Sequence, residues 1–365
     1  RRSFYHRGLR EGQVRGAATD RGRVGPAERE PAQTETPKIV KAGMDRLSDE
    51  EARQVKAVTD RVMANVGDVM VGKREVAELM LVALLCEGNV LVEDVPGVGK
   101  TVLARALAKS LGCDFRRIQC TPDLLPSDVT GVEIYDQVAG SFDFRPGPIV
   151  ANIVLVDEIN RATPRTQSAL LEAMQEQQIT VDRHTVHLPR PFMLMATQNP
   201  VELEGTFPLP EAQLDRFMLR LEIGYPSQGE EAAVLTRFGE SDPFDILEAV
   251  TGGEELLALQ KLCRRVYVDG SVRDYVVDVV RATREHDDVR LGASPRASLG
   301  LHRAAQALAA VRGRSHTLPD DVKLLAVPAL AHRLIVKTEA RLRDRTAEKI
   351  VADVVSKVPA PVEKT

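Results

Sequence analysis

The stretch Asn89 to Thr101 reads N-V-L-V-E-D-V-P-G-V-G-K-T, and the rest of the chain is best understood from it. Its first half, Val90 to Val92, is a short apolar run typical of a buried parallel strand. Pro96, Gly97 and Gly99 then mark a tight loop, and the apolar spacing after this loop predicts a helix. Strand, glycine loop, Lys-Thr and helix, in this order, indicate a phosphate-binding P-loop.

In a P-loop, backbone N–H groups and the positive end of the helix dipole surround the phosphates of a nucleotide. We therefore expect Lys100 to reach the β and γ oxygens and the Thr101 hydroxyl to bind Mg²⁺. The residues expected to line the nucleotide in this way are Pro96, Gly97, Val98, Gly99, Lys100, Thr101 and Val102.

The loop departs from the full P-loop pattern at one position. Asp94 stands five residues before Gly99, where the pattern asks for glycine. Aspartate tolerates unusual backbone angles better than most residues, so the turn is still feasible. The alternative is a glycine turn that merely precedes a helix, and the matching strand and helix on either side argue against it.

A second apolar run ends in two acids. Ile153 to Val156 predicts a central parallel strand, and Asp157 and Glu158 follow it directly. The carboxyl end of such a strand faces the nucleotide crevice of an α/β sheet. We expect Asp157 to hold Mg²⁺, directly or through water, and Glu158 to polarise the attacking water. A solvated strand end is the alternative for these acids.

Further residues are expected to reach a nucleotide. Asn199 follows a predicted strand, Phe192 to Thr197, and is placed to bind the γ-phosphate and the attacking water. Arg216 precedes another predicted strand and could neutralise transition-state charge. The backbone of Val71 and Gly72, in a turn between two predicted helices, is a possible contact for an adenine edge. Each of these is otherwise an ordinary loop residue.

Composition divides the chain into three regions. Residues 1–43 lack hydrophobic periodicity and carry ten Lys and Arg against five acids, so we expect a disordered basic tail. Met44 opens the first orderly stretch, which makes the residues before it an upstream extension or a flexible tail, with a nucleic-acid-binding arm as the functional alternative. Residues 44–224 alternate strands and helices, which predicts an α/β nucleotide-binding domain with a parallel sheet flanked by helices. Residues 225–365 predict a small α-helical domain, within which Arg296 lies at the start of a helix.

Two short β-hairpins are predicted within the α/β region, at 132–136 with 141–145 and at 179–181 with 185–188. His184 and His187 border the second turn, but no cysteine or carboxylate accompanies them at metal-ligand spacing, so turn polarity explains them better than a metal site. The four cysteines form no C-x-x-C pair and are expected to be reduced core thiols of a cytoplasmic protein.

Charge and hydropathy exclude two classes. The net charge is −4, and residues 1–43 carry a net positive charge, so the remainder is acidic and a poor general binder of nucleic acid. An apolar run of roughly 20 residues is needed to cross a bilayer, and the sequence contains none. We expect neither a nucleic-acid partner nor a membrane span.

Several long motifs occur in one order along the chain. They are V-E-D-V-P-G-V-G-K-T, L-V-D-E-I-N-R-A, A-T-Q-N-P-V-E-L-E-G-T-F-P-L-P-E-A-Q-L-D-R-F and S-P-R-A-S. From about Leu47 to Pro361 the sequence resembles the AAA+ ATPases and, more narrowly, the MoxR family. Asp94 fits this resemblance, because the first glycine of the P-loop is often missing in that family.

The resemblance implies a role for each matching residue. Lys100 and Thr101 match the Walker A pair, Asp157 and Glu158 match the Walker B pair, and Asn199 matches the first sensor. ATP and Mg²⁺ are the implied cofactors.

Two arginines and the hairpins also match the family. Arg216 corresponds to the finger offered to the ATP of a neighbouring subunit, and Arg296 to the second sensor on the lid domain. The two hairpins match insertions that face the pore or the substrate. The basic tail has no counterpart in the family.

The function implied is ATP hydrolysis in a homo-oligomeric ring, expected to be a hexamer, that remodels or activates a client protein in the manner of a chaperone. A protein with a von Willebrand factor A domain is the expected client class. Two alternatives stay open: a nucleic-acid motor or metal-chelatase-type subunit, and an ATP-dependent interaction module without turnover. Glu158 and Arg216 argue against the module, since a pure binder needs neither.

Overall fold

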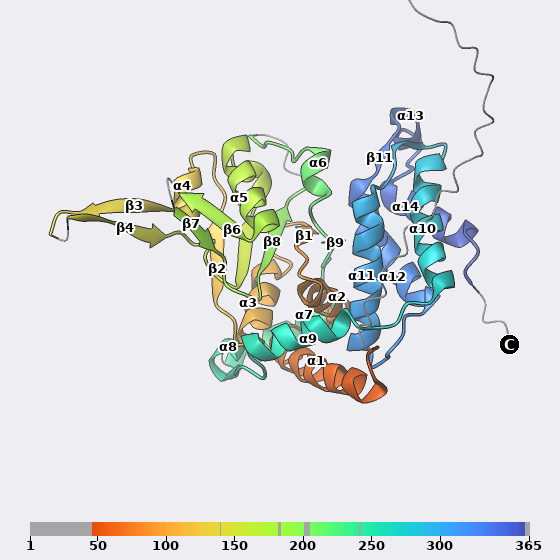
Figure 1. Cartoon of the computed structure of the whole chain (residues 1–365), viewed down its shortest axis with the longest axis horizontal. Helices are drawn as coiled ribbons and strands as arrows, with labels where there is room; N and C mark the ends of the chain where they lie inside the picture. Colours follow the sequence, from red (N-terminus) through yellow and green to blue (C-terminus); the bar gives the residue numbers. More distant parts are fainter. Residues whose placement is uncertain (1–45, 139, 182–183, 201–204, 241, 362–365) are drawn as a thin grey trace, which may run out of the picture. The chain divides into compact units, whose positions relative to one another are not determined.

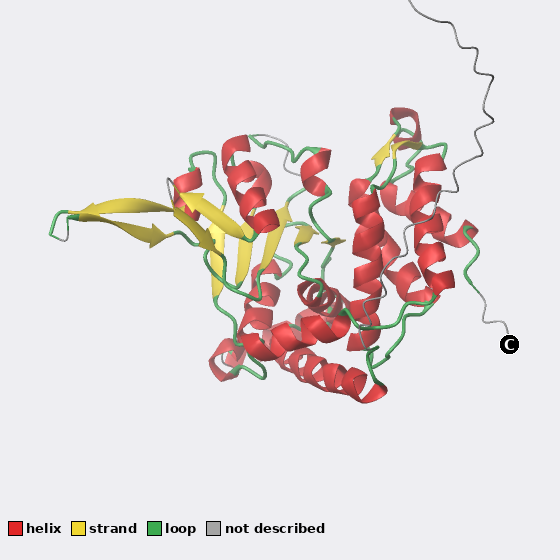
Figure 2. Ribbon diagram, viewed as in Figure 1, coloured by secondary structure: helices red, strands yellow, loops and turns green. Residues whose placement is uncertain are grey.

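Five parallel strands form the central sheet of the protein, in the order β2-β5-β8-β1-β9 (Figures 1 and 2). Since all five strands run the same way, the residues that follow each strand meet at one edge of the sheet. The strands are β1 (Val90–Glu93), β2 (Phe115–Gln119), β5 (Ile153–Asp157), β8 (Met193–Gln198) and β9 (Leu219–Leu221).

The computed structural model describes residues 46–138, 140–181, 184–200, 205–240 and 242–361. The expected basic tail, the Val201–Glu204 part of the longest motif and the tip of the second hairpin lie outside the described residues. Met44–Thr365 form one unit, and the expected division of that unit after Gly224 stays a prediction.

Successive side chains along each strand point to opposite faces of the sheet, and both faces are buried. In β5, Ile153 and Leu155 pack into a large core with the first helices, whereas Val154 and Val156 pack into a second core with α5. This explains why the strand is apolar at every position rather than at every second one. The helices of this part are α1 (Asp49–Val69), α2 (Arg74–Leu85), α3 (Lys100–Ser110), α4 (Pro126–Thr130), α5 (Pro164–Glu176) and α6 (Glu211–Leu214), with a 3₁₀ turn η1 (Ile159–Arg161).

Both predicted hairpins are confirmed. The first, β3 (Gly131–Asp136) with β4 (Ser141–Pro146), projects away from the sheet, as Figure 1 shows at its left. The second, β6 (Gln178–Val181) with β7 (His184–His187), follows α5. The two hairpins contact each other through His184, whose Nε2 lies 3.2 Å from Glu133 Oε1.

The C-terminal part is mostly helical, as predicted, and it shares the larger core with α1 and α2. No helix among the described residues has the length and apolar character that a membrane crossing requires. The elements are α7 (Gln228–Glu240), α8 (Pro243–Ile246), α9 (Gly253–Cys263), α10 (Gly270–Glu285), β10 (Val289–Leu291), α11 (Pro295–Val311), α12 (Pro319–Leu330), η2 (Ala331–Arg333), β11 (Ile335–Val336), α13 (Thr338–Arg341) and α14 (Ala347–Lys357).

Side-chain contacts lie just beyond the ends of two elements. Strand β9 covers only Leu219–Leu221, and two residues later the N–H of Ile223 donates to the Asp94 carboxylate. Helix α12 ends at Leu330, and the chain continues as the tighter turn η2. In that turn the side chains of His332 and Arg333 both hydrogen bond to one carbonyl group, that of Phe217.

Candidate functional site

The P-loop has the conformation that phosphate binding requires. Gly97 and Gly99 have φ angles of 85° and 92°, in the left-handed region that glycine adopts without strain. Gly99 is the N-cap of α3, and no described side chain caps the first turn of that helix. The N–H groups at its N-terminus, which include those of Lys100 and Thr101, are therefore available to an anion. The residues present thus fit a nucleotide phosphate.

Asp94, which replaces the first glycine of the P-loop pattern, is a hydrogen-bonded structural residue. Its buried carboxylate accepts hydrogen bonds from the N–H groups of Ile223 and Gly224 through Oδ2, at 2.7 and 2.6 Å. Oδ1 accepts from the N–H of Val95 at 2.8 Å. Its own N–H donates to the carbonyl of Gln198 at the end of β8. One side chain thereby fixes the start of the P-loop to the segment that leads into the helical part.

Lys100 also contacts this residue, since its Nζ donates to the Asp94 carbonyl at 2.7 Å. Burial lowers the pKa of the Lys100 ammonium, while the carboxylates of Asp157, Asp94 and Glu158 act to raise it. The ammonium is thus half-buried among carboxylates, close to where a polyphosphate would enter.

The two acids after β5 are ordered by one hydroxyl group. Thr197 Oγ1 donates to Asp157 Oδ1 at 2.6 Å and accepts from the N–H of Glu158 at 2.8 Å. Glu158 adopts a left-handed conformation, with φ of 57°, so the chain turns sharply between the two carboxylates. Asn199 directly follows β8, two residues after this threonine. Acids and amide therefore share the carboxyl edge of the sheet with the P-loop.

Strand β2 supplies partners that sequence reasoning missed. Arg117 Nη2 lies 2.7 Å from Asp157 Oδ2, and Gln119 Nε2 donates to Glu158 Oε2 at 2.9 Å. Arg161 also reaches this Glu158 oxygen, at 3.3 Å. The sequence did contain a signal, because polar residues at the end of a strand paired with β5 must lie beside the acids of β5. Which strand pairs with β5 is known only from the strand order, which shows that it is β2.

The turn predicted to face adenine lies beside α7. Gly72 has φ of 69°, and a side-chain atom added there would collide with the carboxylate of Glu230. Lys73 Nζ donates to the carbonyl of Tyr225 at 2.9 Å. Val71 and Gly72 therefore lie close to the chain that follows β9, and their contact with adenine stays a prediction.

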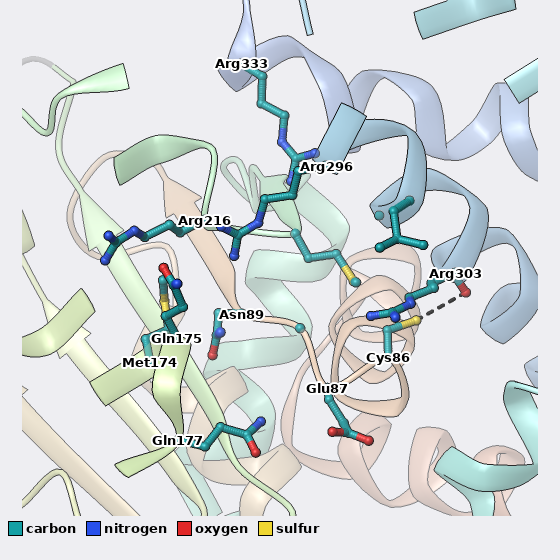
Figure 3. Close-up of a pocket in the computed structure, with 14 residues that line it drawn as sticks. Cys86, Glu87, Asn89, Met174, Gln175, Gln177, Arg216, Arg296, Arg303 and Arg333 are labelled. Atoms are coloured by element: carbon teal, nitrogen blue, oxygen red, sulfur yellow. Dashed lines mark hydrogen bonds between the residues drawn. The ribbon is translucent and has the colours of Figure 1, made fainter. Parts of the chain in front are cut away.

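Arg216 and Arg296 lie away from this edge. They line one pocket of about 180 Å³ with residues that precede β1, among them Gly88 and Asn89 (Figure 3). Because the P-loop follows β1, this pocket is at the opposite, amino edge of the sheet. We call it the arginine pocket; its arginines are Arg216, Arg296, Arg303 and Arg333.

A hydrogen bond links the segment that carries Arg216 to the helix that carries Arg296, and a second one holds the Arg216 side chain. Arg216 Nη1 donates to the carbonyl of Leu171 at 3.1 Å. Ser294 is the N-cap of α11, confirming the predicted helix start, and its hydroxyl donates to the carboxylate of Asp215 at 3.0 Å. The residue before Arg216 is thereby bonded to the helix that carries Arg296.

Comparison with known proteins agrees with this architecture. Residues 89–219 match the model of the ATPase family associated with various cellular activities (AAA), and residues 281–354 match that of the AAA lid domain. A crystal structure of a candidate ATPase from Cytophaga hutchinsonii superposes with a TM-score of 0.81 at 37% identity, covering 86% of this chain and 98% of that one.

Two bacterial relatives decide the family. The chain is 53% identical over 305 residues to "Uncharacterized protein YeaC" of Bacillus subtilis, covering 84% of this chain and 95% of the relative. It is 44% identical over 311 residues to "Chaperone MoxR1" of Mycobacterium tuberculosis, covering 83% of this chain and 82% of the relative. The chain belongs to the MoxR family of AAA+ ATPases.

The predicted fold class is thus confirmed: a MoxR-family AAA+ ATPase domain with a parallel sheet flanked by helices, followed by a helical lid. In this MoxR chain the P-loop, the acids and Asn199 lie together at the carboxyl edge of the sheet, and the two predicted arginines lie together at the other edge.

Proposed function

We propose that this MoxR-family chain hydrolyses ATP at sites formed between neighbouring copies in a ring. The observation that carries this proposal is the separation of two half-sites in one chain. The P-loop, Asp157 and Glu158 lie at the carboxyl edge of the sheet, whereas Arg216 and Arg296 line a pocket at the amino edge. A head-to-tail neighbour would bring the second half-site of one copy to the first half-site of the next.

The residues at the carboxyl edge have separable tasks. Lys100 and the N-terminal N–H groups of α3 would bind the β and γ phosphates. Thr101 and Asp157 would hold Mg²⁺, which when bound neutralises charge on the phosphates. Glu158 would accept a proton from the attacking water, and Asn199 would orient that water. The Thr197 hydroxyl bonds the Asp157 carboxylate and the backbone N–H of Glu158, and so holds the turn between the two acids.

Arg216 and Arg296 would act on the ATP of the adjoining copy. An arginine that reaches a nucleotide from a second subunit is worth roughly 10³ to 10⁵ in rate in other P-loop enzymes. A head-to-tail interface that closes gives a ring, for which six copies are our expectation. Val71 and Gly72 remain the proposed adenine contact.

The projecting hairpin supports a protein client. The rings of Tyr135 and Phe142 contact each other in a tilted arrangement, with centroids 5.2 Å apart, and the two residues are 53% and 67% exposed. Val138 at the turn is 99% exposed. Exposed apolar groups of this kind mark an interaction surface. We propose that they grip a client during ATP-driven remodelling, with von Willebrand factor A domain proteins as the client class. The four free thiols fit a reducing, cytoplasmic location.

The test is steady-state ATPase activity measured against protein concentration, with particle size measured with and without ATP. We expect wild-type activity per chain to rise with concentration as rings assemble. Glu158→Gln should bind ATP and form rings but lose turnover, and Arg216→Ala should bind ATP normally and lose turnover by about 10³ or more.

Mixing separates the shared site from a site within one chain. Lys100→Ala and Arg216→Ala chains are each expected to be inactive alone, while mixed rings should recover part of the activity, because some interfaces then join an intact P-loop to an intact Arg216. Full activity of Arg216→Ala alone would overturn the shared site, and so would two inactive variants that recover no activity when mixed. ATP binding without turnover at every concentration would favour the interaction module.

A further inference from the structure

Both oxygens of the Asp157 carboxylate already accept hydrogen bonds from the protein. Oδ1 accepts from Thr197 Oγ1 at 2.6 Å, and Oδ2 accepts from Nε and Nη2 of Arg117 at 3.2 and 2.7 Å. Carboxylate and hydroxyl oxygens are the ligands that Mg²⁺ prefers, so Asp157 and Thr101 fit this cation. The Arg117 guanidinium therefore occupies the carboxylate that the proposed function assigns to Mg²⁺.

The two partners of this ion pair differ in exposure. The side chain of Asp157 is 13% exposed, whereas that of Arg117 is 48% exposed. A largely buried carboxylate needs a cation close by, because burial penalises its charge. A half-exposed guanidinium gives up little when it exchanges a carboxylate for water. Asp157 thus has a constant need for a cation, and Arg117 supplies one in a form that another cation can displace.

Arg117 keeps an acceptor when it leaves Asp157. Its Nη2 also donates to Oε1 of Gln119 at 2.6 Å. The two residues are two apart on β2, so their side chains lie on the same face of the strand. Strand β2 is an edge strand of the central sheet, with water on its outer side. The guanidinium can therefore stay beside Gln119 while the carboxylate accepts another cation.

The neighbouring cations are bonded to other groups. Lys100 Nζ donates to the carbonyl of Asp94 at 2.7 Å. Arg161 Nη1 lies 3.3 Å from Glu158 Oε2. Of the ion pairs between described residues, Asp157 takes part in the one with Arg117. Arg117 is thus the counter-ion that a metal ion at this carboxylate has to replace.

We propose that Arg117 is a displaceable counter-ion of Asp157. It holds the carboxylate in the nucleotide-free chain and gives it up when Mg²⁺ enters with ATP, so that Arg117 sets how much Mg²⁺ the site needs. Arg117 is a positioning residue in this role, because it acts through Asp157. The inference rests on the proposed function for the task of Asp157, but cation binding can be measured in a single chain without nucleotide.

Strand β2 offers a variant and its matched control. Arg117→Gln removes the guanidinium charge and keeps a polar side chain on the exposed face of the strand. Arg116→Gln makes the same change at the adjacent position, where the side chain points to the other face. The ion pair of Arg116 with Asp114 is 3.7 Å long and exposed on both sides, so its loss should change little.

The first experiment measures Mn²⁺ binding to nucleotide-free chains by electron paramagnetic resonance, with Mn²⁺ as the probe of the Mg²⁺ site. Arg117→Gln should bind Mn²⁺ roughly threefold to tenfold more tightly than wild type, because the cation no longer competes with the guanidinium. Arg116→Gln should match wild type. Adding Asp157→Asn to Arg117→Gln should abolish the gain, which separates this site from weak binding to surface acids.

Thermal unfolding distinguishes displacement from mere support of the fold. Without metal, Arg117→Gln should melt below wild type, and added Mn²⁺ should restore its stability because the metal takes over the lost charge. Arg117→Lys keeps a cation with fewer donors and should lie between the two in Mn²⁺ affinity. A purely structural ion pair predicts a lower melting temperature with no gain in Mn²⁺ affinity. Binding that is equal in wild type and Arg117→Gln, or undetectable in both, would overturn the proposal.

The second experiment titrates Mg²⁺ into chains that hold a fluorescent ATP analogue. Arg117→Gln should reach half-saturation at an Mg²⁺ concentration roughly threefold to tenfold lower than wild type. In EDTA the order should reverse, because an Asp157 without its counter-ion repels the phosphates and weakens binding of the analogue. Weaker binding at every Mg²⁺ concentration would make Arg117 a simple nucleotide-binding residue and refute displacement.

Turnover separates this inference from the proposed function. Unchanged cation binding by Arg117→Gln, in a chain that hydrolyses ATP, would refute the displacement and leave the proposed function intact. Tighter Mn²⁺ binding that depends on Asp157, in a wild type without turnover at any concentration, would support the displacement and count against the proposed function.

Discussion

At the scale of single residues, Asp94 is the most informative position. In the sequence, Asp94 stands where the P-loop pattern has a glycine. From the sequence alone, the question is only whether the turn can form with aspartate at this position. The structure gives the carboxylate three backbone N–H donors, from Val95, Ile223 and Gly224. The departure from the pattern is therefore a structural bond between the P-loop and the entry to the lid.

Replacing Asp94 by glycine would restore the P-loop pattern and still harm the protein. Asp94→Gly leaves three N–H groups without their acceptor, so we expect unfolding in urea to require about 1 to 3 kcal/mol less free energy. ATP affinity should fall as well, because the P-loop loses its fixed start. Fluorescent-nucleotide titration and urea unfolding measure the two effects.

The control for this prediction is Asp114→Gly. Asp114 also lies in a connecting segment, but its side chain is 56% exposed. Its Oδ2 atom forms an exposed ion pair with Nε of Arg116 at 3.7 Å. Such an exposed pair contributes little, about 1 kcal/mol at most. Equal losses of stability in the two variants would show that the Asp94 bonds have no special weight.

At the scale of elements, α11 combines folding and function at its first turn. Ser294 caps the helix by accepting from the N–H of Ala297, and it donates to Asp215 beside Arg216. One side chain therefore sets where the helix begins and how the loop that contains Arg216 lies against it.

Ser294→Ala is predicted to affect both stability and activity. Loss of an N-cap typically costs about 1 kcal/mol, and the Asp215 contact is lost with it, so turnover should fall with ATP binding retained. Thr346→Ala is the matched control, because Thr346 caps α14 in the same way and does not line the arginine pocket. Thermal unfolding and ATPase assays compare the two; an equal drop in turnover in both would contradict the prediction.

At the scale of the whole molecule, the contact between core and lid is buried and polar. His332 of η2 lies against the carbonyl of Phe217, on the segment that leads into β9. Burial, with the charges of Arg333 and Arg220, lowers the pKa of His332 to about 3, although its hydrogen bond to Phe217 acts to raise it. The imidazole is thus neutral in the folded protein at neutral pH.

This predicts acid sensitivity of the fold. The folded pKa of about 3 is below the unfolded value of about 6.5. Between these values the unfolded chain takes up a proton that the folded chain does not, so stability is complete above about pH 6.5 and falls as the pH drops towards 3. His332 therefore lowers the free energy of unfolding by at most about 1.4 kcal/mol for each pH unit in this range.

His332→Gln isolates this effect, since other titrating groups remain in both proteins. Urea unfolding of wild type and variant between pH 7 and pH 5 should give a wild-type stability that falls more steeply. Parallel curves would show that His332 does not titrate as the geometry implies.

Sequence alone determined the P-loop, the acids after β5, both hairpins and the start of α11. These features depend on local chemistry: glycine where φ is positive, apolar runs where a strand is buried, and capping serine and proline where a helix begins. The motifs also gave the MoxR family, since they are long and occur in a fixed order.

Tertiary structure alone decided which of these residues meet. Strand order sets Arg117 and Gln119 beside the acids, and neither residue is near them in sequence. The bonds of Asp94 to Ile223 and Gly224 span about 130 residues, and the bond of Arg333 to Phe217 spans 116. Local patterns carry no information about contacts at such separations, because these depend on how the strands order and how the lid packs on the core. The separation of the nucleotide edge from the arginine pocket is therefore a property of the fold.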